Sequence, residues 1–218
     1  VFVSARQSWH RLNNLLARIP DDRDVMQLPR PKASLSVEAV SVAPPGVNML
    51  VARDIAFNLK AGQGLGIIGP SASGKSSLVR ALVGVWRPVS GKVRIDGATL
   101  DQWSSEALGE HVGYLPQDME LFAGTVAQNI ARLEPEPDAA KVIAAAQAAG
   151  VHELILGLPN GYETEMGEGG TALSAGQRQR VGLARALYGD SFLVVLDEPN
   201  SSLDHEGEEA LTKAILSV

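Results

Sequence analysis

The glycine-rich segment 69–76, GPSASGKS, constrains the fold of this chain more than any other feature. Its pattern, G-x-x-x-x-G-K-[ST], is typical of a loop whose backbone N–H groups surround a polyphosphate at the start of a helix. In such a loop Lys75 reaches the terminal phosphates, and the Ser76 hydroxyl meets a Mg²⁺ ion. Alone this segment is a moderate signal, so the prediction depends on what else the chain carries.

A second segment, LSAGQ at 173–177, predicts a helix with a polar cap. Ser174 and Gln177 have the S-x-x-Q spacing of a capping box, and the helix is expected to run to Tyr188 and stop at Gly189. The free N–H groups and the positive dipole end of this helix would form a second anion site.

The third segment, FLVVLDEP at 192–199, reads as a buried strand followed by two acidic residues. The strand delivers Asp197 and Glu198 to its carboxyl end, which is the edge where an open α/β sheet binds ligand. Taken in order, the phosphate loop, LSAGQ and this strand resemble the nucleotide-binding domain of ATP-binding cassette proteins.

The resemblance implies an α/β fold of the P-loop NTPase type. We expect a mostly parallel core sheet, an antiparallel β edge and a helical subdomain at about 118–188, in an ATPase domain spanning 34–218. The chain is expected to be truncated at its C-terminus, before the final strands of the domain. Residues 1–33 are interpreted as the end of the last transmembrane-domain helix plus a linker. The pattern of Trp9, Leu12, Leu16 and Ile19 also fits an amphipathic helix that packs on the domain.

Local patterns predict the elements that carry these motifs. The expected strands cover 35–42, 55–59, 64–69, 92–96, 112–115 and 192–196, and the expected helices cover 74–85, 139–149, 174–188 and 206–216. Strand 64–69, GLGIIG, is expected to feed the phosphate loop.

Composition excludes some classes of function. The net charge of −6 and pI near 5.2 offer no basic surface for a nucleic acid, so we expect no nucleic-acid partner. The absence of cysteine excludes disulfides, thiolate metal sites and a cysteine nucleophile. No stretch of the chain reaches the 18 or more apolar residues of a membrane span.

The resemblance assigns roles in ATP hydrolysis with Mg²⁺, a reaction that needs positioning, charge stabilisation and an oriented water. Glu198 is the expected catalytic base; Ser76, Gln117 and Asp197 are the expected metal ligands. Alternatively, the acidic pair is a solvated strand end and Gln117 an ordinary loop residue. The expected nucleotide-binding residues are Gly69, Pro70, Ser71, Ala72, Ser73, Gly74, Lys75, Ser76, Ser77, Gln117, Ser174, Gly176 and Gln177.

In the same family the LSAGQ helix meets the nucleotide held by a second copy, which implies a homodimer with two ATP molecules at the interface. Ala175 stands where glycine is usual, and we expect the backbone at Gly176 to keep its anion-binding form. The loop 201–204, SSLD, resembles the one that communicates between the two copies, while Asp204 also fits a helix cap.

Two departures from the family pattern concern the nucleotide. Segment 42–45 reads Val-Ala-Pro-Pro, so no aromatic residue is present there to stack on adenine. A histidine that contacts the terminal phosphate would lie beyond the end of this chain, since His205 is too close to Asp204. The other histidines are expected to be surface or cap residues: His10, His111 and His152.

Further segments resemble one branch of the family. LFAGTVAQNI at 121–130 and GEGG at 167–170 are similar to exporters, and 35–205 as a whole resembles the type I secretion permease/ATPases that export proteases and other polypeptides. The resemblance implies a location at the cytoplasmic face of the plasma (inner) membrane. The implied partners are the protein's own transmembrane domain, membrane-fusion proteins and outer-membrane secretion proteins.

Three other functions fit the sequence less well. The linker and GEGG argue against a free-standing importer subunit. A DNA-repair ATPase would place a long coiled coil between the phosphate loop and LSAGQ, but only about 97 residues without heptads separate Ser76 from Leu173. Glu198 argues against a regulatory module that binds nucleotide without turnover.

Overall fold

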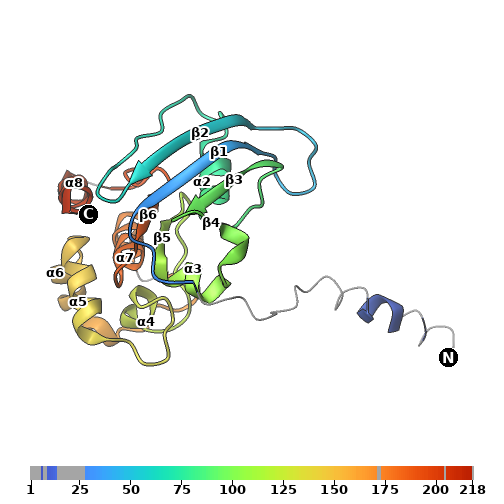
Figure 1. The fold of residues 1–218 in the computed structure, drawn as a ribbon. Helices are drawn as coiled ribbons and strands as arrows, with labels where there is room; N and C mark the ends of the chain where they lie inside the picture. The colour runs from blue at the N-terminus through green and yellow to red at the C-terminus, as the bar shows by residue number, and fades with distance from the viewer. Residues whose placement is uncertain (1–5, 7–8, 14–27, 171–172, 204, 218) are drawn as a thin grey trace.

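The computed structural model describes residues 6, 9–13, 28–170, 173–203 and 205–217. An antiparallel sheet covers helix α2, and a short parallel sheet lies beside helix α7 and the smaller helices α4 to α6 (Figure 1). The strands are β1 Ser34–Val42, β2 Ala52–Lys60, β3 Ser90–Ile95, β4 Ala98–Thr99, β5 Val112–Leu115 and β6 Leu193–Leu196. The helices are α2 Lys75–Leu82, α3 Ser105–His111, α4 Val126–Ile130, α5 Ala139–Ala148, α6 His152–Leu156, α7 Ala175–Leu187 and α8 His205–Ser217, with 3₁₀ turns η1 Leu100–Gln102, η2 Gly161–Glu163 and η3 Glu168–Gly170.

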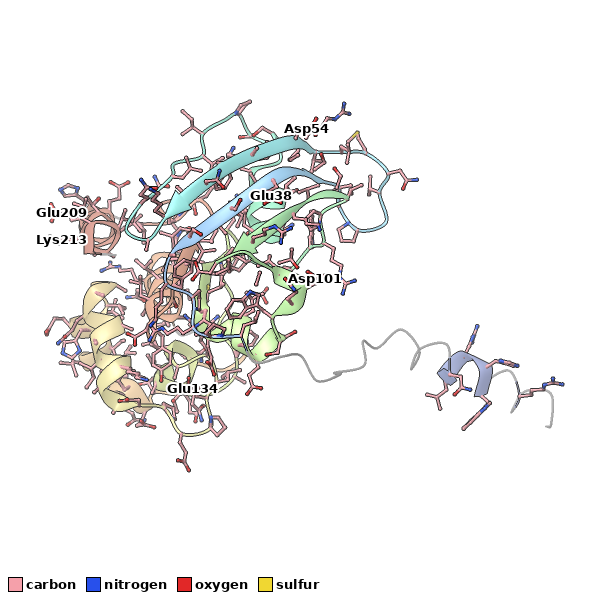
Figure 2. The ribbon with its side chains drawn as sticks, viewed as in Figure 1. Glu38, Asp54, Asp101, Glu134, Glu209 and Lys213 are labelled. Carbon is pink, nitrogen blue, oxygen red and sulfur yellow. The ribbon has the colours of Figure 1, made fainter. Side chains whose placement is uncertain are left out.

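The antiparallel sheet has the order β2-β1-β3-β4. Leu35 and Val37 of β1 alternate with more exposed residues, as expected for a sheet with one buried face, and both belong to a core shared with α2. Glu38 lies on the same strand and accepts from the Arg94 guanidinium at 3.2 Å (Figure 2). This sheet is the predicted antiparallel β edge.

The parallel sheet joins the segments that the sequence singled out. Val112 pairs with Leu193 and Leu115 with Leu196, so the carboxyl ends of β5 and β6 lie side by side. Helix α7 packs against β5 so closely that a Cβ at Gly113 would lie 1.9 Å from the Ala186 carbonyl oxygen. The residues that follow the two strands therefore meet at one edge of the sheet.

Within the helical subdomain, helix α7 is held to the segment around α4 by arginines as well as by an apolar core. The Arg185 guanidinium donates to the backbone and side-chain oxygens of Asn129, at 2.8 and 2.7 Å, and to the Glu120 carbonyl. Burial, followed by the nearby charge of Arg132, lowers the pKa of Arg185 to about 10, so the side chain stays cationic at neutral pH. Glu134, between α4 and α5 in Figure 2, accepts from the Tyr188 hydroxyl at 2.8 Å. The expected α/β fold with a helical subdomain is confirmed.

One predicted strand is wrong. Residues 64–69 form no strand and are exposed, because their backbone groups have no neighbouring strand with which to pair. A cavity of about 700 Å³ lies beside them, lined by residues of this segment and of β6. A segment of apolar residues with high β propensity forms a strand only where a neighbouring strand can accept and donate its backbone hydrogen bonds. Among the described residues, β6 pairs with β5 and not with residues 64–69.

The N-terminal segment is described only in part. Residues 9–13 are helical, in line with the predicted helix, and Trp9 and Leu12 are exposed. The rest of the predicted helix lies outside the described residues, as does Asp204, the predicted cap. Within the described part of the chain, no helix is both long enough and apolar enough to cross a membrane.

Candidate nucleotide-binding site

The phosphate loop turns sharply into α2. Ala72 and Gly74 both have left-handed backbones, with φ of 63° and 91°. Gly74 is required for a second reason, because a Cβ there would lie 2.4 Å from the Val51 carbonyl oxygen. The loop is thus packed against the segment that leads into β2.

Lys75, the first residue of α2, folds back over the loop. Its Nζ donates to the carbonyl oxygens of Gly69 and Pro70 at 2.8 and 2.9 Å. These bonds hold the ammonium group at the mouth of the loop, where it would face a bound phosphate. Among the other predicted loop residues, Ser71 and Ser73 are exposed, and Ser77 is half-buried on α2.

Ser76 and Asp197, which are far apart in the sequence, are brought together. The Ser76 hydroxyl donates to Oδ1 of Asp197 at 3.1 Å. Asp197 is only 4% exposed, and its Oδ2 has no hydrogen-bond partner among the described residues. A buried carboxylate oxygen without a partner is costly, and a hard cation such as Mg²⁺ prefers this kind of oxygen donor. The residues therefore fit a magnesium ion.

The surroundings of Asp197 agree with such a site. Tyr114 on β5 has a raised pKa, first because of burial and then because of the negative charge of Asp197, so the phenol stays neutral. The described residues contain no group of three or more His, Cys, Asp or Glu that could hold a metal. Mg²⁺ does not require one, because it usually binds one or two carboxylates plus phosphate and water oxygens.

Gln117 and Glu198 form a second pair at the same edge of the parallel sheet. Gln117 follows β5 by two residues, and its Nε2 donates to Oε2 of Glu198 at 2.9 Å. Both side chains are exposed, so a water molecule can reach the carboxylate. Glu198 has a φ of 49°, an uncommon left-handed backbone for a residue other than glycine.

The predicted second anion site begins at α7. Ser174 Oγ accepts from the Gln177 backbone N–H at 3.3 Å, and Gln177 Oε1 accepts from the Ser174 backbone N–H at 2.9 Å, so the capping box is confirmed. Ala175 does not have a positive φ, and the methyl group is accommodated in an ordinary helical turn. Gly176 lies in the same first turn.

Sequence reasoning missed Gln179, which lies two residues after the LSAGQ segment. This residue is buried on α7, and its carboxamide bonds to the backbone of the loop that carries Glu198. The position of a polar residue on the buried face of a predicted helix could have indicated a buried hydrogen bond. It could not have indicated that the bond is made to the loop after Glu198.

A phosphate loop and an Asp-Glu strand end on an α/β fold define a nucleotide-binding domain of the P-loop class. Residues 52–201 match the family model described as ABC transporter, and the chain therefore belongs to the ABC transporter family.

The chain is similar to several ABC transporter proteins. It is 61% identical, over 99% of its length, to the type I secretion system ATP-binding protein PrsD of Rhizobium meliloti (strain 1021), and covers 37% of that protein. It is 34% identical to the uncharacterized ABC transporter ATP-binding protein YfiB of Bacillus subtilis (strain 168), covering 99% of this chain and 38% of that one. A bacterial Atm1-family ABC exporter solved with ATP bound matches the whole chain and 39% of its own, with a TM-score of 0.80 and 30% identity. The chain thus spans well under half the length of these relatives.

Proposed function

We propose that this chain is the ATP-hydrolysing motor domain of a membrane exporter that secretes polypeptides, such as proteases, by a type I pathway. The observation that carries the proposal is the 61% identity to a type I secretion ATP-binding protein over 99% of the chain. The pairing of Ser76 with Asp197 and of Gln117 with Glu198 supports an ATPase site.

The phosphate loop binds the nucleotide through its backbone N–H groups and the positive end of α2. Lys75 exchanges its two carbonyl partners for phosphate oxygens and offsets charge that develops on the transferred group. Ser76 and Asp197 would hold Mg²⁺, with Gln117 as a further ligand. When bound there, the ion would supply positive charge that offsets the charge of the phosphate groups.

Glu198 acts on the attacking water as general base. The Gln117 amide donates to one carboxylate oxygen of Glu198, which leaves the other oxygen free to accept the water proton. Gln117 lies two residues after β5, where the chain enters the helical subdomain, and its amide binds the carboxylate of Glu198. Movement of that subdomain would therefore change the orientation of the Glu198 carboxylate.

The first turn of α7, with Ser174, Gly176 and Gln177, faces the nucleotide of a second copy. ATP binding would then close a homodimer, and closure would move the protein's own transmembrane domain through the helical subdomain. In this proposal the domain lies at the cytoplasmic face of the inner membrane. Membrane-fusion and outer-membrane proteins complete the export path.

The test is steady-state ATP hydrolysis by the full-length protein in lipid vesicles with Mg²⁺. Glu198→Gln is expected to lower kcat by about 10²-fold or more with ATP binding retained, because a general base contributes on that scale. Glu110→Gln, a change at an exposed glutamate of α3, is the matched control and should be neutral. Turnover by Glu198→Gln equal to that of the control would refute the assigned base. No hydrolysis by the unmodified protein would refute the motor function itself.

A further inference from the structure

Gln179 uses its whole carboxamide on one loop. The side chain is 3% exposed, and its Nε2 lies 2.7 Å from the Pro199 carbonyl oxygen and 3.3 Å from that of Glu198. Its Oε1 accepts from the Ser202 backbone N–H at 3.0 Å, while the Ser201 hydroxyl lies 3.4 Å from Nε2. The loop that runs from Glu198 to Ser202 is therefore bound at both its start and its end by a single side chain.

A second contact fixes the same loop to the same helix. A Cβ at Gly176 would lie 2.6 Å from the Ser202 carbonyl oxygen, so the first turn of α7 lies directly against the loop backbone. Positions 176 and 179 are three residues apart and share one face of the helix. The loop is thus held to α7 by close packing as well as by hydrogen bonds.

The backbone of Glu198 needs such support. A left-handed φ costs roughly 1–2 kcal/mol for a residue with a Cβ, and such conformations persist where the surroundings fix them. The Gln179 amide donates to the carbonyl group of Glu198 itself, next to the strained φ. Oε2 of Glu198 is held from the opposite side by Gln117.

We propose that Gln179 is the positioning residue for Glu198: its carboxamide ties the backbone from which the carboxylate reaches the attacking water to helix α7. The inference rests on the proposed function, since it assumes Glu198 to be the base.

The experiment compares Gln179→Leu with Val181→Ala in the full-length protein in lipid vesicles. Leucine keeps most of the volume of glutamine and makes none of its hydrogen bonds, whereas Val181→Ala removes a buried contact on α7 away from the loop. Gln179→Leu is expected to lower kcat at least tenfold, with KM for ATP changed less than about twofold. Val181→Ala is expected to lower Tm while keeping kcat. A kcat loss in Gln179→Leu no larger than that in Val181→Ala, at similar loss of Tm, overturns the proposal.

Gln179→Glu supplies a readout that does not depend on how the leucine variant folds. Its carboxylate faces two carbonyl oxygens when ionised, but the protonated acid can again donate to Pro199. The ratio of its kcat to that of the unmodified protein should therefore rise as pH falls from 8.5 to 6. A ratio that does not change with pH counts against positioning by this amide.

The unmodified protein and Glu198→Gln are measured alongside these variants. If Glu198→Gln turns over as fast as the unmodified protein, the assignment of the base fails and the inference falls with it; if the unmodified protein does not hydrolyse ATP, the proposed function itself fails. If Glu198→Gln is inactive while Gln179→Leu behaves like Val181→Ala, the inference alone is overturned.

Discussion

Asp197→Asn is expected to have opposite effects on the free protein and on nucleotide binding. The amide keeps an oxygen that accepts from Ser76, but removes a buried negative charge whose Oδ2 has no partner among the described residues. An unpartnered buried polar group costs about 1–3 kcal/mol, and a charged one costs more. Since the amide leaves its own NH₂ group unpaired, the net gain is about 1 kcal/mol. For a chain of this size that corresponds to a rise in Tm of about 2–4 °C.

The same substitution removes a charged contact from the proposed magnesium site. Contacts to charged groups are worth about 1.5–3 kcal/mol. The affinity for ATP with Mg²⁺ should therefore fall roughly 10- to 100-fold.

Calorimetry of the nucleotide-free protein in EDTA measures the expected rise in Tm. A titration with ATP in the presence of Mg²⁺ measures the expected loss of affinity. Asp54→Asn is the matched control, because Asp54 is an exposed carboxylate on β2 (Figure 2) that is assigned no part in the site. A lower Tm for Asp197→Asn in EDTA would refute the argument that the unpartnered oxygen destabilises the free protein. An unchanged ATP affinity would refute the assignment of Asp197 to the metal.

Three further predictions concern other residues. Arg185→Met should destabilise the protein by roughly 2–4 kcal/mol in urea, because it leaves the Asn129 oxygens without their charged donor, whereas a loss under 1 kcal/mol would contradict this. Ala72→Gly should leave the free energy of unfolding unchanged or raise it by up to about 1 kcal/mol, because glycine relieves the left-handed backbone but loses more entropy on folding. A clear loss of stability would count against backbone strain at this position. Although burial opposes its ionisation, the backbone N–H groups of residues 32–34 lower the pKa of Asp96. The stabilising contribution of the Asp96 carboxylate should be present above the pKa that the group has in the unfolded chain, and should be lost as pH falls through its pKa in the folded protein. Asp96→Asn should therefore lower Tm at pH 7 and make little difference to Tm near pH 2.

Features fixed by local chemistry were predictable from the sequence. The capping box at Ser174 needs only two side chains three residues apart, and the structure shows both of its bonds. Strand 112–115 was predicted with the bounds that β5 has, and β6 differs from its prediction by one residue. Ser76 and Asp197 were both predicted from their motifs to bind the same metal, and the Ser76 hydroxyl lies 3.1 Å from Oδ1 of Asp197 even though the strand predicted before the phosphate loop is absent.

Features that depend on a partner distant in the sequence were not predictable in this way. GLGIIG has the composition of a strand, but a strand exists only where another strand supplies its hydrogen bonds. Gln179 is one polar residue in an arginine- and glutamine-rich helix, and its bonds reach backbone groups about 20 residues away. The pattern of the helix shows which side is buried, but not which loop that side meets.

The site contains several energetically costly features, although left-handed residues other than glycine also occur elsewhere, for example at Ala39 and Leu133. Asp197 has a buried oxygen without a partner, and Glu198 and Ala72 have left-handed backbones, all within the segments proposed to bind ATP and Mg²⁺. Lys75 meanwhile binds the carbonyl oxygens of its own loop, which are weaker partners than phosphate oxygens. Because a ligand that binds only the folded state adds RT ln(1 + [L]/Kd) to stability, ATP with Mg²⁺ at 100 times Kd should add about 2.7 kcal/mol. This gain should shrink sharply in Asp197→Asn and remain in Glu198→Gln, because the first residue is proposed to bind the metal and the second to act on the water. Equal gains in the two variants would contradict that division of roles.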